Sequence, residues 1–127
     1  MGKVIEKIKL TSLFDPAKSV EVDAVVDTGA TVMVLPQNIV DELSLRKIRE
    51  VTVKYANNQR QQKSIYAGLL VDIKGRIGNF DALAEEAGTE ALIGQIVLEE
   101  LDLVVEPGTR TLMPNPRSPE MPMVEIL

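Results

Sequence analysis

Carboxylates are the main groups through which this chain could carry out chemistry. Its 127 residues include 19 Asp and Glu residues but no Cys and no His. Without Cys and His a protein has no disulfides, thiolate nucleophiles, cysteine–histidine zinc sites or Ser-His-Asp arrangement. General acid–base chemistry would therefore fall to carboxylates, with Lys or Tyr behind them. We expect neither a metal site nor a cofactor.

One carboxylate, that of Asp27, is distinguished by its neighbours. The segment Val25–Thr31 reads Val-Val-Asp-Thr-Gly-Ala-Thr. Strand-forming residues would carry Asp27 to the end of a rigid sheet, where a side chain can be held in a fixed position. The Thr28 hydroxyl could hold the loop that follows, and Gly29 lets the chain turn sharply and another backbone come close. The competing interpretation is a plain turn, since Asp and Gly are both frequent in turns.

The overall charge argues against a nucleic-acid partner. The formal net charge is −5 and the isoelectric point is near 4.8, so a phosphate backbone would be repelled. The most basic short stretch, Arg60–Lys63, holds only two charges, and no basic stripe is expected. The N-terminal segment lacks the apolar region of a signal peptide. No apolar run approaches the roughly eighteen residues of a membrane span. We therefore expect a cytoplasmic protein with no membrane partner.

Alternating apolar residues predict a mostly β structure in a chain of single-domain length. We expect a hairpin from strands near residues 4–10 and 20–26, and a buried strand at 32–35. A short helix should begin at Pro36 and end near Ser44. A second hairpin should follow, with its tip at Asn57 and Asn58 and its return strand over 61–73. A turn at 74–78 would lead into a strand at 80–84.

The last third of the chain predicts short elements and then an irregular tail. We expect a strand at 91–93 that stops at Gly94, a helix at 95–101, and strands at 103–105 and 111–113. Four prolines after residue 113 argue against a helix or a central strand there. We therefore assign residues 1–113 to one domain and residues 114–127 to a Pro-rich extended arm.

The sequence resembles the pepsin-like and retropepsin-like aspartic proteases, and among these the single-domain bacterial type. Val25–Thr31 is similar to their active-site motif, in which two hydrophobic residues precede Asp-Thr-Gly-Ala. Leu92-Ile93-Gly94, just before the expected helix, is similar to their second motif. The hairpin expected at 51–61 lies where these families carry a flap. The resemblance covers residues 4–113 and implies an all-β, acid-protease-like closed barrel or sandwich with one or two short helices and a flap hairpin.

Two departures from the family pattern concern the site. Retroviral members usually carry an acidic residue two positions after the Gly of the first motif, and an Arg after the Gly of the second. Here these positions are Thr31 and Gln95, so that ion pair cannot form. Flap tips in the family are often rich in Gly, whereas residues 56–59 read Ala-Asn-Asn-Gln, which indicates a stiffer flap.

The resemblance also implies an active site shared by two chains. Peptide hydrolysis by carboxylates needs one group to activate water and another to protonate the carbonyl oxygen. Two close carboxyl groups share a proton because both cannot ionise, and aspartic proteases are the standard example. The chain has one Asp-Thr-Gly, so a C2 homodimer would supply the second Asp27. The expected site residues are the catalytic Asp27; the active-site loop Thr28, Gly29 and Ala30; the flap Ala56, Asn57, Asn58 and Gln59; and the cleft wall Leu92, Ile93 and Gly94.

The expected activity is that of an aspartic endopeptidase acting on peptide or protein substrates. The alternative is a catalytically weak or inactive dimeric module that binds extended peptides. Carboxylate-based glycoside hydrolysis is disfavoured, because only 3% of the residues are aromatic and sugars usually stack on aromatic rings. The remaining acids are interpreted as solvated faces and the tyrosines as packing residues; they are Glu42, Glu85, Glu86, Glu99, Glu100, Tyr55 and Tyr66.

Overall fold

The structure, a computed structural model, describes residues 3–127 and begins with an antiparallel hairpin. Strand β1 (Ile5–Ser12) pairs with β2 (Ser19–Val26) through a turn in which the Lys18 amide donates to the Asp15 carbonyl at 2.8 Å. Alternate residues of both strands point to the core, as period-2 patterning requires. The hairpin expected from the sequence is confirmed, and β2 ends one residue before Asp27.

The other elements follow closely the order expected from the sequence. They are β3 (Met33–Pro36), α1 (Gln37–Glu42), β4 (Arg46–Lys54), β5 (Arg60–Ile73), β6 (Arg76–Glu85), β7 (Ala91–Ile93), α2 (Gln95–Leu101), β8 (Leu103–Glu106) and β9 (Thr111–Pro114). Pro36 both ends β3 and caps α1, because its fixed φ of −67° suits the residue that precedes a helix.

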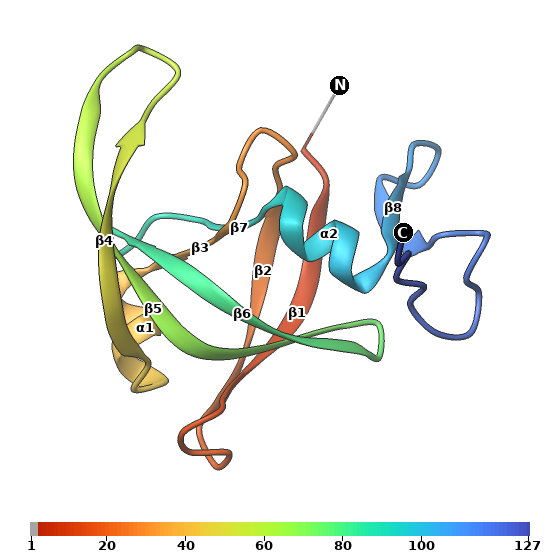
Figure 1. Ribbon diagram of the computed structural model, residues 1–127, viewed down its shortest axis with the longest axis horizontal. Helices are drawn as coiled ribbons and strands as arrows, with labels where there is room; N and C mark the ends of the chain where they lie inside the picture. The colour runs from red at the N-terminus through yellow and green to blue at the C-terminus, as the bar shows by residue number, and fades with distance from the viewer. Residues whose placement is uncertain (1–2) are drawn as a thin grey trace.

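Six strands close into a barrel. The order is β1-β2-β7-β3-β6-β5, and β1 pairs again with β5 to complete the circle, while β4 extends from the outer side of β5. In Figure 1 the β4–β5 hairpin rises at one end of the molecule, and β8 lies with the C-terminus at the other. The expected all-β closed barrel, with two short helices in residues 3–127, is confirmed. Within the same residues, no helix has both the length and the apolarity to span a membrane.

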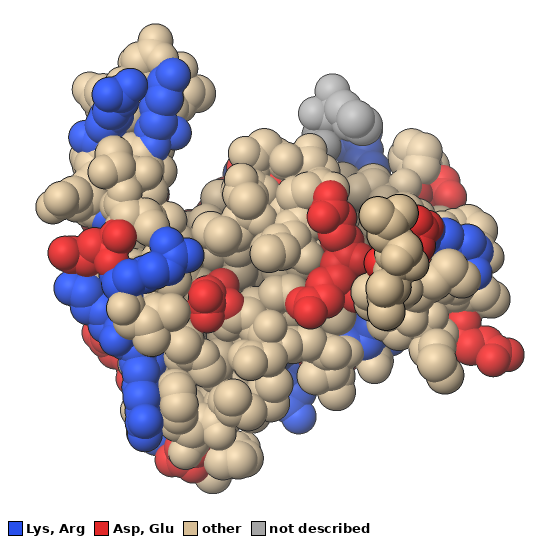
Figure 2. All heavy atoms as spheres, in the orientation of Figure 1, with Lys and Arg blue, Asp and Glu red and all other residues tan. Residues whose placement is uncertain are grey.

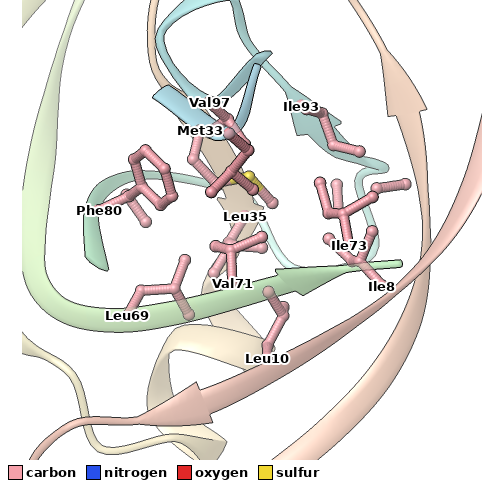
Figure 3. Packing of buried hydrophobic residues seen from close by; sticks show 14 of the residues in the cluster. Ile8, Leu10, Met33, Leu35, Leu69, Val71, Ile73, Phe80, Ile93 and Val97 are labelled. Carbon is pink, nitrogen blue, oxygen red and sulfur yellow. The ribbon is translucent and has the colours of Figure 1, made fainter. Parts of the chain in front are cut away.

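The barrel encloses an almost purely aliphatic core. Side chains from β1, β3, β5, β7 and α2 converge on its centre, as Figure 3 shows for Leu10, Leu35, Val71 and Ile93. Burial of one such side chain contributes about 1.5–3 kcal/mol. The core therefore fixes the positions at which β2 and β7 end, and these two ends bear the site.

Two element boundaries differ from the sequence-based expectation. The turn expected at 74–78 is only Lys74-Gly75, with φ of 53° and 84°, so β6 begins at Arg76 and not at Phe80. Two consecutive positive φ angles are typical of the tight turn that matches strand twist. In addition, β4 begins at Arg46, where a bulge between Lys47 and Arg49 lets a segment without clear alternation stay paired with β5.

Candidate active site

Parallel pairing of β2 with β7 places Asp27 at a fixed point. Val26 lies opposite Ile93, and the Asp27 amide donates to the Ile93 carbonyl at 3.0 Å. The chain then turns, because the Ala30 amide donates back to the Asp27 carbonyl at 3.1 Å. The backbone at Asp27 is thus held on both sides, which leaves its side chain to project from the end of the sheet.

The Asp27 carboxylate is half-buried and only lightly hydrogen-bonded. The Gly29 amide donates to Oδ1 at 2.9 Å, and no other donor within residues 3–127 reaches the side chain. A Cβ on Gly29 would lie 3.1 Å from the same oxygen, closer than most such contacts. Oδ2 is therefore left with lone pairs that a water molecule or a second carboxyl group can use.

The second motif supports the first through backbone contacts. The amides of Gln95 and Ile96, at the start of α2, donate to the carbonyls of Ala30 and Thr31 at 2.8 and 3.0 Å. Gly94 makes this approach possible, since a Cβ there would lie 2.3 Å from the Val32 carbonyl oxygen. The loop is thus fixed without the ion pair that Thr31 and Gln95 cannot form.

A cleft of about 600 Å³ opens beside Asp27. Its walls are mainly aliphatic and come from both sides: Val32, Val34, Leu83 and Leu92 from the barrel, and Val51 and Val53 from β4. Leu92 is half-buried and faces this cleft, whereas Ile93 is 0% exposed and faces the core. Ile93 therefore belongs to the core and not to the cleft wall, because neighbours on a strand point to opposite faces. Gly94 is also buried, behind the Asp27 loop.

The β4–β5 hairpin projects over the cleft, and its tip is Ala56–Gln59. All four tip residues are exposed, and Ala56 borders the cleft. The Tyr55 amide donates to the Gln59 carbonyl and the Asn58 amide to the Tyr55 carbonyl, both at 2.9 Å. Asn58 has φ of 67°, a conformation that Asn tolerates better than most residues. The hairpin expected from the sequence is confirmed, and its turn is well hydrogen-bonded.

A polar cluster between the outer part of this hairpin and the end of β6 was missed from the sequence. Tyr55 donates from its hydroxyl to Glu85 Oε2 at 2.8 Å, and Lys63 Nζ lies 2.9 Å from Glu85 Oε1. The interpretation of Glu85 as a solvated residue is therefore wrong, since its side chain is only 21% exposed. Burial, then the bond to Glu85, raises the pKa of Tyr55, while the bond to Glu85 raises the pKa of Lys63. Tyr55 likewise does more than pack.

The hairpin also carries a concentration of positive charge. Figure 2 shows basic side chains gathered over β4 and β5, and the residues are Arg46, Lys47, Arg49, Lys54, Arg60 and Lys63. The expectation of no basic stripe is wrong, because it considered short stretches of sequence. Pairing of the two strands places Lys54 directly opposite Arg60 and gathers the bases of both strands on one hairpin.

Comparison with known proteins agrees with the fold and the site. Residues 17–100 match the model of the family described as "gag-polyprotein putative aspartyl protease". The EIAV protease, in complex with the inhibitor HBY-793, matches with a TM-score of 0.61 at 15% identity, over 76% of this chain and 86% of that one. The simian foamy virus (mac) protease matches in its solution structure with a TM-score of 0.54 at 19% identity, over 74% and 90% of the two chains. No curated protein matches by sequence.

The fold is thus that of the retroviral aspartic proteases. The family match covers well over half of the chain, so the chain belongs to the gag-polyprotein aspartyl protease family. The expected acid-protease fold is confirmed by the two solved structures.

Proposed function

We propose that the protein is an aspartic endopeptidase whose active site is formed by two copies of the chain. The observation that carries the proposal is the Asp27 carboxylate, which has one unbonded oxygen beside an aliphatic cleft of about 600 Å³. A projecting hairpin borders the same cleft. An extended peptide would bind there with apolar side chains against Val34, Val53 and Leu92, much as an added strand does.

The chemistry requires two carboxyl groups that act together. One Asp27 would take a proton from water while the other gives a proton to the scissile carbonyl oxygen. Thr28, exposed on the same loop, would lock the two active-site loops across the dimer axis. Gly29 and its neighbours would hydrogen-bond the substrate backbone, and the hairpin would close over it as a flap. The expected relation to bacterial single-domain proteins and the cytoplasmic location stay predictions.

The test is a subunit-mixing experiment. Sedimentation should give twice the chain mass of 13.9 kDa, and the wild type should cleave members of a peptide library. If one site needs both chains, an excess of Asp27→Asn subunits should remove activity in proportion to the fraction of mixed dimers. Activity that falls only with the amount of wild-type protein, as for independent monomers, would contradict the shared site.

A non-catalytic module that binds extended peptides is the second candidate. The observation that favours it is the flap tip, where a hydrogen-bonded turn without Gly replaces a flexible one. Both candidates need a hairpin tip that contacts the bound peptide, and hydrogen exchange tests this. The amides of residues 56–59 should be protected when a peptide analogue binds, whereas a plain turn would show equal protection with and without it. Binding without cleavage across a broad library would establish the second candidate.

A further inference from the structure

A second pocket, of about 320 Å³, adjoins the cleft beside the β4–β5 hairpin. It shares three lining residues with the cleft, Tyr55, Glu85 and Thr89, so a peptide that fills the cleft would lie next to it. Its other lining residues are all polar, in contrast to the aliphatic walls of the cleft. They are Asn57, Gln59, Gln61, Lys63 and Glu86. We call this space the side pocket.

The side pocket forms because β5 is longer than its pairing with β6. The β5–β6 ladder reaches only Ile65 and Leu83 at this end, whereas the β4–β5 ladder continues to Arg60. The chain that follows β6 then makes a turn, in which the amide and the hydroxyl of Thr89 donate to the Glu86 carbonyl at 3.2 and 2.8 Å. The side pocket is the space between this fixed turn and the unpaired edge of β5.

The register of the hairpin directs the polar side chains of β5 to the same side as the cleft. Gln61 lies opposite Val53, and Lys63 lies opposite Val51. Side chains directly opposite each other in an antiparallel pair share one face of the sheet. Since both valines line the cleft, Gln61 and Lys63 also lie on the face of the hairpin that is turned toward it. Lys54 alternates to the other face and does not line the side pocket.

The charges that line the side pocket do not cancel. Lys63 Nζ lies 2.9 Å from Glu85 Oε1, and the Tyr55 hydroxyl donates to Oε2, so both oxygens of Glu85 are engaged. Glu86 is exposed and makes no ion pair within residues 3–127. The bond to Glu85 is the main cause that raises the pKa of Lys63, and the charge of Glu86 adds to it, as expected for a neighbouring anion. One cation and two anions give the side pocket a net charge of −1.

We propose that the side pocket binds a basic side chain, Lys or Arg, of a peptide whose apolar residues lie in the cleft. Its ammonium or guanidinium group would pair with Glu86 and donate to the side-chain oxygens of Gln59 and Gln61. An acidic side chain would be repelled by Glu86 and could reach the Lys63 ammonium only in competition with Glu85. This inference rests on the proposed function for its dimer, in which each copy would contribute one side pocket.

The test measures binding separately from cleavage. The protein is made with Asp27→Asn, and two synthetic peptides share a Val-Leu stretch that is flanked on both sides by Arg in one and by Gln in the other. We expect the Arg peptide to bind about three- to tenfold more tightly, as two exposed ion pairs allow, and the difference to vanish near 1 M salt. Glu86→Gln on this background should reduce the preference to less than about twofold, because only screened attraction to the rest of the chain remains. Affinity for the Gln peptide should be unchanged.

Two matched controls separate the side pocket from the overall charge. Glu100→Gln removes the same charge from an exposed position of α2 and should keep the preference. Gln61→Arg should abolish the preference, because the new base would itself lie beside Glu86. Gln62→Arg adds the same charge one position along β5, on the opposite face, and should keep it. Equal binding of the Arg and Gln peptides by the Asp27→Asn protein would overturn the inference, and so would equal effects of Glu86→Gln and Glu100→Gln.

Failure of the proposed function gives a different result. A protein with Asp27 intact that cleaves neither peptide, yet prefers the Arg peptide through Glu86, would refute the endopeptidase and leave the basic-residue site intact. Cleavage of both peptides at equal rates and with equal affinities would do the reverse. If neither peptide is bound or cleaved, both proposals are wrong.

Discussion

Two aspartates that each follow a secondary-structure element, Asp27 and Asp102, have opposite surroundings. Asp27 follows β2, is half-buried and accepts one hydrogen bond. Asp102 follows α2 with φ of 54°, is 4% exposed, and accepts five hydrogen bonds. The five donors are Ser118 Oγ, Asn115 Nδ2, Arg117 Nε and Nη2, and the Met123 amide.

The difference separates the carboxylate that we propose to be catalytic from a structural one. The bond from the Ser118 hydroxyl, together with those from Arg117, Met123 and Asn115, holds the pKa of Asp102 well below its usual range. Such a group stays ionised and has no lone pair free for a substrate. Buried Arg76 binds the carbonyls of Leu101 and Asp102 at 3.0 and 3.1 Å, and also that of Ser118. Asp102 is thus the point where the C-terminal segment joins the barrel.

The same substitution at the two positions should give opposite results, and the largest effect should be on activity at Asp27. Asp27→Asn keeps the shape but removes the group that we propose to activate water, so kcat/KM on a cleaved peptide should fall by about 10³-fold or more. Its melting temperature should change little, because only the Gly29 amide contacts the side chain. Asp23→Asn, exposed on β2, is the control. Retained activity in Asp27→Asn would remove Asp27 from the chemistry.

Asp102→Asn should instead affect stability. The new amide NH₂ would face groups that are themselves donors, leaving buried donors without acceptors. We expect the melting temperature to fall on the order of 10 °C, with kcat/KM per folded molecule nearly unchanged. Thermal unfolding followed by circular dichroism, with kinetics below the transition, checks both. Loss of activity without loss of stability would mean that Asp102 takes part in the site.

The pH dependence of stability should show how much the charge of Asp102 contributes to the fold. The pKa of Asp102 is lower in the folded state than in the unfolded one, so its ionised form stabilises the fold fully above the unfolded value of about 3.9. This stabilisation is lost as the pH falls from there through the folded value. The gap in unfolding free energy between wild type and Asp102→Asn should therefore be constant above about pH 5 and shrink in stronger acid. A gap that does not change with pH would refute the role of the charge.

Sequence patterns predicted the parts of this molecule that depend on local chemistry. Alternation predicted β1, β2 and the β4–β5 hairpin, and the apolar spacing after Gly94 predicted α2. The unpredicted features depend on pairings between distant residues. Lys54 meets Arg60, and Glu85 meets Tyr55 and Lys63, only once β4, β5 and β6 are aligned. Centring the hairpin on Asn57 would have predicted the first contact, since positions 54 and 60 are equidistant from it.

Asp102 was not singled out because its donors lie in the Pro-rich segment. No periodicity in residues 114–127 indicates which of their polar groups turn back toward the barrel. The structure answers this with a turn, in which the Ser118 amide donates to the Asn115 carbonyl at 2.8 Å and aligns both side chains with Asp102. A hydrogen-bond network of this kind depends on three-dimensional arrangement and has no short sequence signature.

The smallest expected effect concerns the β4–β5 hairpin. It tests whether a side-chain hydrogen bond holds this hairpin in place, as the bonds to Asp102 hold the C-terminal segment. Tyr55→Phe keeps the ring but removes the 2.8 Å bond that ties the outer part of the hairpin to Glu85, at the end of β6. One such bond contributes about 0.5–1.5 kcal/mol, so the melting temperature should fall only slightly. If the bond restrains the flap, amides of residues 55–60 should exchange about threefold faster or more in the free protein, and KM should rise with kcat little changed.

Tyr66→Phe is the matched control, because the Tyr66 hydroxyl accepts only a long 3.4 Å bond from Gln37. Equal changes in both variants would show that the hydroxyls act through general packing, and no change in either would show that the flap moves independently of Glu85.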